Sequence, residues 1–182
     1  MYYFLRQNIF DAKNSIEITG HTEATGEQNW TVGRPFSKSL SVQELTLDSR
    51  YGEEYPDFFD TTIPVMSQKL LSFLVSLGVS NIDSYAVNLK DRATTYQGYY
   101  AVNVIGVIDG VDLNDSEYRL RFNKPYFTGK VVIDENKVKG ARLFRLLHGP
   151  GLIVISQDIA DELMKHEWSA IMLQPTEDYE GT

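Results

Sequence analysis

Two stretches of the chain share one pattern, in which a short apolar strand ends at a serine and leads into a helix. These stretches are Val65-Met66-Ser67-Gln68 and Val154-Ile155-Ser156-Gln157. After each, apolar residues recur at helical spacing and a second apolar strand follows. Serine is a good helix N-cap, because its hydroxyl accepts hydrogen bonds from the free amides of the first turn. Two strand–Ser-capped helix–strand units predict helices packed on a sheet, in an α+β or mixed α/β fold.

The two units also align with each other without gaps. Apolar residues coincide in three aligned pairs: Leu70 with Ile159, Leu74 with Leu163, and Ile82 with Ile171. An internal duplication would produce this agreement. Chance agreement of apolar positions would produce it as well, so the sequence leaves the origin of the two units open.

Alternation of apolar and polar residues indicates the other strands, and it predicts a several-stranded sheet that is largely antiparallel or mixed. Strand-like runs cover residues 2–6, 15–19, 41–47, 82–89, 99–108, 118–122, 131–133, 143–146, 152–155 and 169–173. In the run 41–47, Val42, Leu45 and Leu47 are expected to face the core. The 182 residues suffice for one large domain. We expect one continuous domain, in which residues 1–56 form N-terminal strands and a loop packed on a main α+β region, 57–182.

The composition excludes several kinds of protein. The chain has no cysteine, which removes disulfides, thiolate nucleophiles and cysteine-based zinc sites. It shows no basic leader followed by an apolar run and no stretch of membrane-spanning length, so we expect a cytoplasmic protein. The net charge of −8, from 17 basic and 25 acidic residues, opposes binding to nucleic acid or to anionic membranes. It favours a basic partner, although the charge would equally well serve solubility alone.

The residue types that carry catalysis form no recognisable pattern. The chain has neither a glycine-rich phosphate loop before a helix nor the G-x-S-x-G nucleophile elbow. Ser67 and Ser156 are therefore interpreted as helix caps rather than nucleophiles. The three histidines, His21, His148 and His166, share no metal-ligand spacing. We predict no catalytic residue, no metal site and no cofactor.

One enzymatic alternative stays open. His148 lies in the turn His148-Gly149-Pro150-Gly151, and function often concentrates in such turns. A small hydrolase would use His148 with acidic residues, and a metal-dependent enzyme would hold its metal with Asp109 and Asp112. The structural interpretation is an exposed turn histidine and carboxylates that an acidic composition brings together by chance.

The segment Tyr51-Gly52-Glu53-Glu54-Tyr55-Pro56-Asp57-Phe58-Phe59-Asp60 interleaves four aromatic residues with four carboxylates. Aromatic side chains anchor interfaces at low entropic cost, and acidic neighbours select a basic partner. We therefore expect a partner-binding site at Tyr51, Glu53, Glu54, Tyr55, Asp57 and Asp60. In the alternative interpretation, Phe58 and Phe59 belong to the core and the carboxylates lie on a loop surface.

Several segments resemble one protein family in their order along the chain. They are Pro64-Val65-Met66-Ser67-Gln68-Lys69-Leu70-Leu71, Tyr99-Tyr100-Ala101-Val102-Asn103-Val104 followed by Asp109 and Val111-Asp112-Leu113, Leu143-Phe144-Arg145-Leu146, Val154-Ile155-Ser156 and residues 171–175. Over residues 57–175 the chain is similar to immunity-protein family eleven of bacterial polymorphic-toxin systems. Residues 1–56 add nothing specific to the resemblance.

The resemblance implies a cytoplasmic protein that binds and neutralises a cognate protein toxin, and the acidity of this chain suggests a basic toxin such as a nuclease. It implies no catalytic residue. The motif residues Ser67, Asp109, Asp112, Phe144, Arg145 and Ser156 are expected to be structural. Of these, Phe144 and Arg145 are the pair most expected to matter, and packing with a buried ion pair would explain them equally well. A module that self-associates through sheet edges, including a homodimer, is a further hypothesis.

Overall fold

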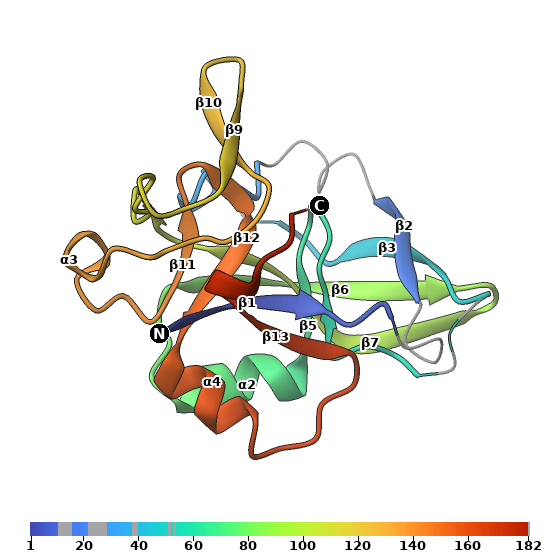
Figure 1. The fold of residues 1–182 in the computed structure, drawn as a ribbon. Helices are drawn as coiled ribbons and strands as arrows, with labels where there is room; N and C mark the ends of the chain where they lie inside the picture. The colour runs from blue at the N-terminus through green and yellow to red at the C-terminus, as the bar shows by residue number, and fades with distance from the viewer. Residues whose placement is uncertain (11–15, 22–28, 38–39, 51, 53, 182) are drawn as a thin grey trace.

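The computed structural model describes residues 1–10, 16–21, 29–37, 40–50, 52 and 54–181 (Figure 1). The strands are β1 (Tyr2–Gln7), β2 (Glu17–His21), β3 (Gln43–Asp48), β4 (Phe58–Phe59), β5 (Val65–Ser67), β6 (Ile82–Asp91), β7 (Thr94–Val104), β8 (Val107–Ile108), β9 (Tyr118–Arg121), β10 (Lys124–Phe127), β11 (Leu143–Leu146), β12 (Gly149–Ser156) and β13 (Ile171–Pro175). The helices are α2 (Gln68–Ser76), α3 (Glu135–Val138) and α4 (Gln157–Leu163), with the short 3₁₀ helix η1 (Thr176–Asp178).

The strands divide between two sheets and one separate hairpin. A six-stranded sheet has the order β2-β3-β6-β7-β5-β4, and a five-stranded sheet has the order β13-β1-β12-β11-β8. Strands β3 and β6 are parallel, as are β8 and β11, while the other pairs are antiparallel. The prediction of an α+β fold with mixed strand pairing is confirmed. Periodicity did not reveal that the strands form two sheets rather than one.

The two aligned units have the same local topology. Strands β5 and β6, joined by α2, both pair antiparallel with β7 and flank it. Strands β12 and β13, joined by α4, likewise both pair antiparallel with β1 and flank it. Each unit is therefore a strand–helix–strand crossover around a third strand. The central strand follows the first unit directly, whereas the central strand of the second unit is the N-terminal β1.

Helices α2 and α4 lie next to each other and share one core with both sheets (Figure 1). Leu70 and Leu74 of α2 and Ile159 and Leu163 of α4 are fully buried there. Full burial of one such side chain is worth about 1.5–3 kcal/mol, so this shared core couples the two units. No helix in the described ranges is long and apolar enough to cross a membrane.

The outer face of each sheet is covered as well. Residues 111–138 and Tyr179 pack on one face of the five-stranded sheet, where Phe4, Phe144 and Val154 are buried. Trp30 and its neighbours pack on the outer face of the six-stranded sheet, over Leu45 and Leu89. The five-stranded sheet is thus covered on both faces, whereas β3 and β6 of the six-stranded sheet keep one face open to solvent, where Glu44, Thr46, Ser84 and Ala86 are exposed.

Three sequence expectations need correction. Gln43 rather than Val42 faces inward, because β3 begins two residues later than the expected run and Gln43, unlike Val42, alternates in step with Leu45 and Leu47. The run 99–108 is broken at Gly106, whose φ of 115° turns the chain so that β8 joins the other sheet. Residues 131–133 form only a single bridge, between Val111 and Ile133.

The serine caps differ from each other. The Ser67 hydroxyl accepts a hydrogen bond from the Leu70 amide at 3.1 Å, as predicted. Ser156 has the extended backbone of an N-cap, but its hydroxyl accepts no hydrogen bond from the helix. It bonds instead to the Asp158 carboxylate, a strong acceptor two residues along the chain. The prediction of a side-chain cap at Ser156 is therefore wrong.

We expect Ser67→Ala to destabilise the fold by about 1–2 kcal/mol, because it removes the cap of α2. Ser156→Ala is the matched control, and it is expected to cost less than about 0.5 kcal/mol because no cap is lost. Urea unfolding followed by circular dichroism measures both values. Equal losses for the two variants would contradict the difference between the caps.

Candidate partner-binding surface

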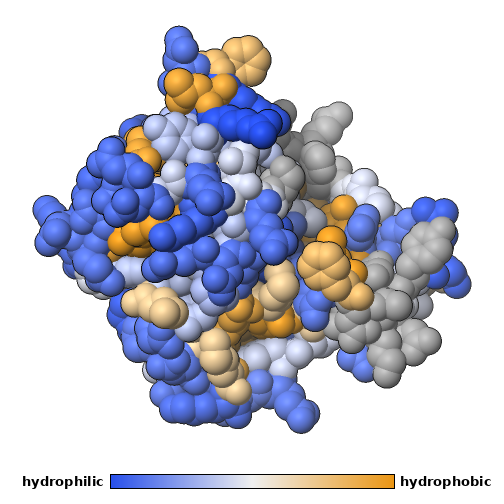
Figure 2. Space-filling model, in the orientation of Figure 1, coloured by the Kyte–Doolittle hydropathy of each residue, from blue (hydrophilic) through white to orange (hydrophobic). Residues whose placement is uncertain are grey.

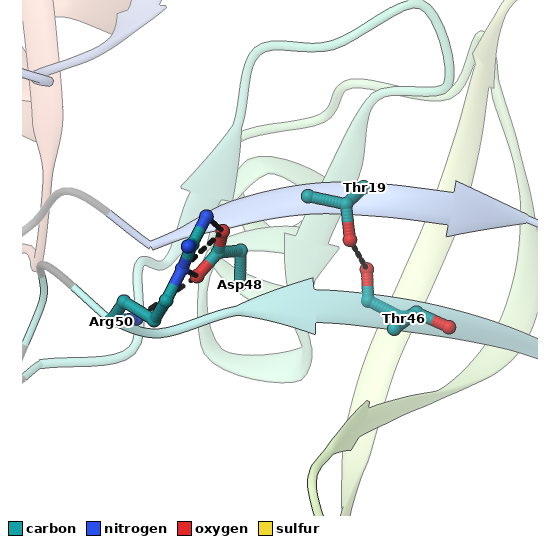
Figure 3. A network of polar contacts seen from close by, with 4 residues as sticks. All are labelled: Thr19, Thr46, Asp48 and Arg50. Carbon is teal, nitrogen blue, oxygen red and sulfur yellow. Dashed lines mark hydrogen bonds and ion pairs between the residues drawn. The ribbon is translucent and has the colours of Figure 1, made fainter.

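An ion pair at the end of β3 precedes the aromatic and acidic segment 51–60. Arg50 donates from Nε and Nη2 to the Asp48 carboxylate at 2.6–3.0 Å, next to the contact between Thr19 and Thr46 (Figure 3). These hydrogen bonds lower the pKa of Asp48 to about 2. Asp48 is therefore neutralised by its neighbour rather than available to a partner.

The residues predicted to bind a partner differ in their exposure and in their contacts within the chain. Tyr51 and Glu53 lie outside the described residues. Glu54 is exposed to solvent. Tyr55 is half-buried, and its hydroxyl donates to Asp91 Oδ2 at 2.9 Å while its ring packs 4.1 Å from the ring of Tyr96. Burial and these neighbours raise the pKa of Tyr55.

Asp57 connects the two halves of the fold. Its carboxylate accepts a hydrogen bond from the Ser67 hydroxyl at 2.5 Å and one from the Ser169 amide at 3.0 Å. Its backbone also bonds to Ser67 and Ser169, at 2.9 Å each. The Lys69 amine lies 3.8 Å from the carboxylate. Asp57 therefore joins the start of α2 to the turn before β13.

Asp60 also makes its contacts within the chain. Arg6 Nε lies 2.5 Å from its carboxylate, and the Asp60 amide donates to the Gln7 side chain. Burial raises the pKa of Asp60, although the guanidinium groups of Arg6 and Arg145 oppose the shift. The adjacent Phe58 and Phe59 are fully buried, as the alternative interpretation of this segment had them.

A groove opens between the exposed end of this segment and the loop from α4 to β13. It has a volume of about 740 Å³. Its floor is apolar, formed by Leu163, Ile171 and Leu173, and its rim carries Glu54, Met164 and Glu167. In Figure 2, apolar side chains gather over β13 and the end of α4 and are surrounded by hydrophilic residues. The groove thus combines apolar contact area with carboxylates.

Trp168 forms one wall of the groove and is held in place from several sides. Its indole Nε1 donates to the Leu163 carbonyl at 2.9 Å. The Lys69 amine lies 4.5 Å from its ring centroid, and the rings of Phe73 and His166 lie 5.2 and 6.2 Å away. A partly exposed, immobilised tryptophan is a frequent energetic centre of protein interfaces. The sequence reasoning missed this site, although a tryptophan among charged residues after a helix was a usable signal.

The enzymatic alternative has weak geometric support. His148 Nε2 lies 3.8 Å from Asp109 Oδ1, and His148 lines a pocket of about 380 Å³ together with Arg6 and Asp60. Within the described residues, however, the His148 side chain makes no hydrogen bond that would orient it as a base. Asp112 instead accepts a hydrogen bond from the Asn114 amide. No group of three metal-binding side chains occurs among the described residues.

The remaining motif residues lie inside the molecule. Phe144 is buried and meets the Tyr2 ring edge-on at 5.8 Å. Arg145 is fully buried and donates from Nη1 to the Pro150 carbonyl at 2.5 Å. Burial lowers the pKa of Arg145 to about 10, and the charge of Asp60 opposes this shift. These residues contribute to the interior rather than to a surface that a partner could reach.

Comparison with models of known protein families gives a match. The model of the immunity protein family (Imm11) matches residues 10–178, which is nearly the whole chain. The match extends across most of the N-terminal region in which the sequence motifs gave no specific resemblance. No curated protein sequence matches the chain.

Because the pKa of Asp60 is raised in the folded protein, the free energy of unfolding depends on pH through this residue. Its stabilising contribution is present below the ordinary carboxyl pKa of about 3.9, and it is lost as the pH rises through the native pKa. We therefore expect the unfolding free energy of the native chain, relative to that of Asp60→Asn, to fall as the pH rises above about 4. Urea unfolding at several pH values measures this difference.

Asp48→Asn serves as the control for the Asp60 experiment because the pKa of Asp48 is shifted downward. The unfolding free energy of the native chain, relative to that of Asp48→Asn, is expected to rise as the pH increases from about 2 to 4, since a lowered pKa means that folding favours the charged form. A difference for Asp60 that rises with pH would mean that Arg6 and Arg145 outweigh the effect of burial.

Proposed function

This chain belongs to the Imm11 immunity protein family, and we propose that it neutralises its cognate toxin by binding it directly at the groove beside Trp168. The action requires no chemical step by the immunity protein itself. We place it in the cytoplasm of the cell that makes the toxin, as part of a polymorphic-toxin system.

The observation that carries the choice of surface is the combination of Trp168 with an apolar floor and two rim carboxylates. Fixed aromatic rings lose little conformational entropy on binding, so they supply affinity efficiently. The contacts with Leu163, Lys69 and Phe73 hold the indole before any partner arrives. Such an arrangement suits the tight binding that an immunity protein needs.

The charge of the rim indicates which toxin surface would fit. Glu54 and Glu167 are exposed, and the chain carries a net charge of −8. Opposite charges on the toxin would speed the encounter of the two proteins. A basic toxin, such as a nuclease whose surface is adapted to phosphates, is the partner that this rim favours.

A hydrolase that uses the small pocket beside His148 is the second candidate, supported by the distance of 3.8 Å between His148 and Asp109. The two candidates differ in what they require of His148. Under direct binding, His148→Ala leaves neutralisation of the toxin unchanged. Under the enzymatic alternative, the same variant abolishes it.

The direct test uses the protein encoded by the neighbouring reading frame, which under this proposal carries a toxin domain. Bacteria that express this toxin domain should stop growing, and co-expression of the native chain should restore growth. The two purified proteins should form a complex that calorimetry detects. Absence of both rescue and complex formation would refute the proposed function.

We expect Met164→Ser to weaken toxin binding about tenfold, because it removes apolar contact at the rim of the groove. Val75→Ser on α2 is the matched control. Val75 is 56% exposed and Met164 is 57% exposed, but Val75 does not line the groove. Equal effects of the two variants on the dissociation constant would exclude the groove as the binding site.

The double variant Glu54→Gln/Glu167→Gln tests the contribution of charge. It should slow association with the toxin several-fold and reduce the salt dependence of the association rate. Stopped-flow measurements at low and high salt provide these rates. Unchanged rates would remove the argument for a basic toxin.

A further inference from the structure

The β9–β10 hairpin projects from the body of the molecule and belongs to neither sheet (Figure 1). All four residues of β9 are exposed. Leu120 is 65% exposed, and Phe122, at the tip, is completely exposed. In Figure 2, apolar side chains are visible at the end of this projection, next to hydrophilic ones. The described part of the chain therefore leaves the Phe122 side chain uncovered.

The backbone conformation at the tip of the hairpin is unfavourable for a bulky side chain such as that of Phe122. Phe122 and Asn123 form the two-residue turn between β9 and β10, and their φ angles are 51° and 60°. Turns with two positive φ angles favour Asn and Gly, whereas bulky side chains are strained in this region. Asn123 therefore suits its position and Phe122 does not. Strain without a compensating internal contact points to a contact outside the chain.

The hairpin is firmly attached at its base. Phe127 is buried in the core on the outer face of the five-stranded sheet. The amide of Thr128 donates to the Glu117 carbonyl, and the amide of Glu117 donates to the Lys130 carbonyl. Gly129 leaves room for the Glu117 side chain, which a Cβ at this position would overlap. The tip is thus presented by a braced support rather than by a loose loop.

The hairpin is also basic, although the chain as a whole is acidic. Arg119, Arg121 and Lys124 are exposed on its two strands. The Arg121 guanidinium lies 3.9 Å from the centroid of the Tyr126 ring, which holds it on one side of the hairpin. None of these three basic residues forms an ion pair with a carboxylate of the described chain. The hairpin therefore fits an apolar groove with an acidic rim.

We infer that the hairpin of one copy docks into the groove beside Trp168 of a second copy. That groove has the required chemistry, because Leu163, Ile171 and Leu173 form its floor and the carboxylates of Glu54 and Glu167 stand at its edge. The hairpin and the loop from α4 to β13, which lines the groove, lie at opposite ends of the molecule (Figure 1). Association is therefore head to tail, and it builds a ring or a growing series of copies rather than a two-fold dimer.

The biological consequence of this self-association rests on the proposed function. If the toxin occupies the same groove, self-association and toxin binding exclude each other. Free immunity protein then forms assemblies that the toxin dissociates, since a tightly bound toxin displaces a weaker hairpin. The assembly keeps the apolar groove covered while no toxin is present.

Sedimentation velocity over a concentration series of the native chain tests the association directly. The mean mass should increase with concentration, pass that of a dimer, and decrease again when salt is added. Phe122→Asn should reduce the association at least tenfold and leave the protein monomeric. Its midpoint of urea unfolding should equal or exceed the native value, because Asn suits a positive φ.

Val42→Asn is the control, since Val42 is 57% exposed and lies outside both the hairpin and the groove. It should leave self-association unchanged. Glu54→Gln/Glu167→Gln should weaken self-association and toxin binding together, whereas Phe122→Asn should leave toxin binding intact. If the native chain does not bind the toxin but still self-associates in a manner sensitive to Phe122→Asn, the proposed function fails and the inference stands.

Two outcomes would overturn the inference. One is a native chain that stays monomeric at every concentration. The other is a Phe122→Asn variant that assembles like the native chain. If the native chain is monomeric and Phe122→Asn weakens toxin binding, the hairpin is instead a contact for the toxin.

Discussion

The contacts of the Asp57 carboxylate tie the two strand–helix–strand units to each other. One oxygen binds the serine hydroxyl that starts α2, and the other binds the Ser169 amide immediately before β13. Ser67 belongs to the six-stranded sheet, whereas Ser169 leads into the five-stranded sheet. Ser169 also lines the groove beside Trp168, so the Asp57 carboxylate holds one residue of the groove wall in place. Charge-assisted hydrogen bonds of this kind are stronger than neutral ones, which suits a link on which a surface depends.

The carboxylates of this acidic chain serve two different purposes. Asp48, Asp57 and Asp60 are used within the molecule, where each faces a basic or hydroxyl group. Glu54 and Glu167 remain exposed at the groove. Formal net charge does not distinguish these groups, because paired charges contribute little to the field that a partner meets. The position of unpaired charges is therefore a better guide to the partner than the total of −8.

The sequence predicted the elements of this fold more successfully than their arrangement. The helices were recognisable because their apolar residues repeat at the helical period, and Ser67 was recognisable as a cap from its position. Neither the division into two sheets nor the insertion of β1 between β12 and β13 leaves a local pattern. The groove combines Glu54 with residues 163–173, which are more than 100 positions away in the chain. The tip of the hairpin was hidden because Phe-Asn is an unusual turn sequence.

The place of β1 in the five-stranded sheet has a consequence for how the protein is made. Residues 2–7 are synthesised well before both of their strand partners, residues 149–156 and 171–175. During translation β1 has no native neighbour, while the strands of the six-stranded sheet between residues 17 and 104 can already pair. Closing so large a loop is slow, and it exposes an apolar strand meanwhile. The five-stranded sheet therefore completes its folding only after β13 has been synthesised.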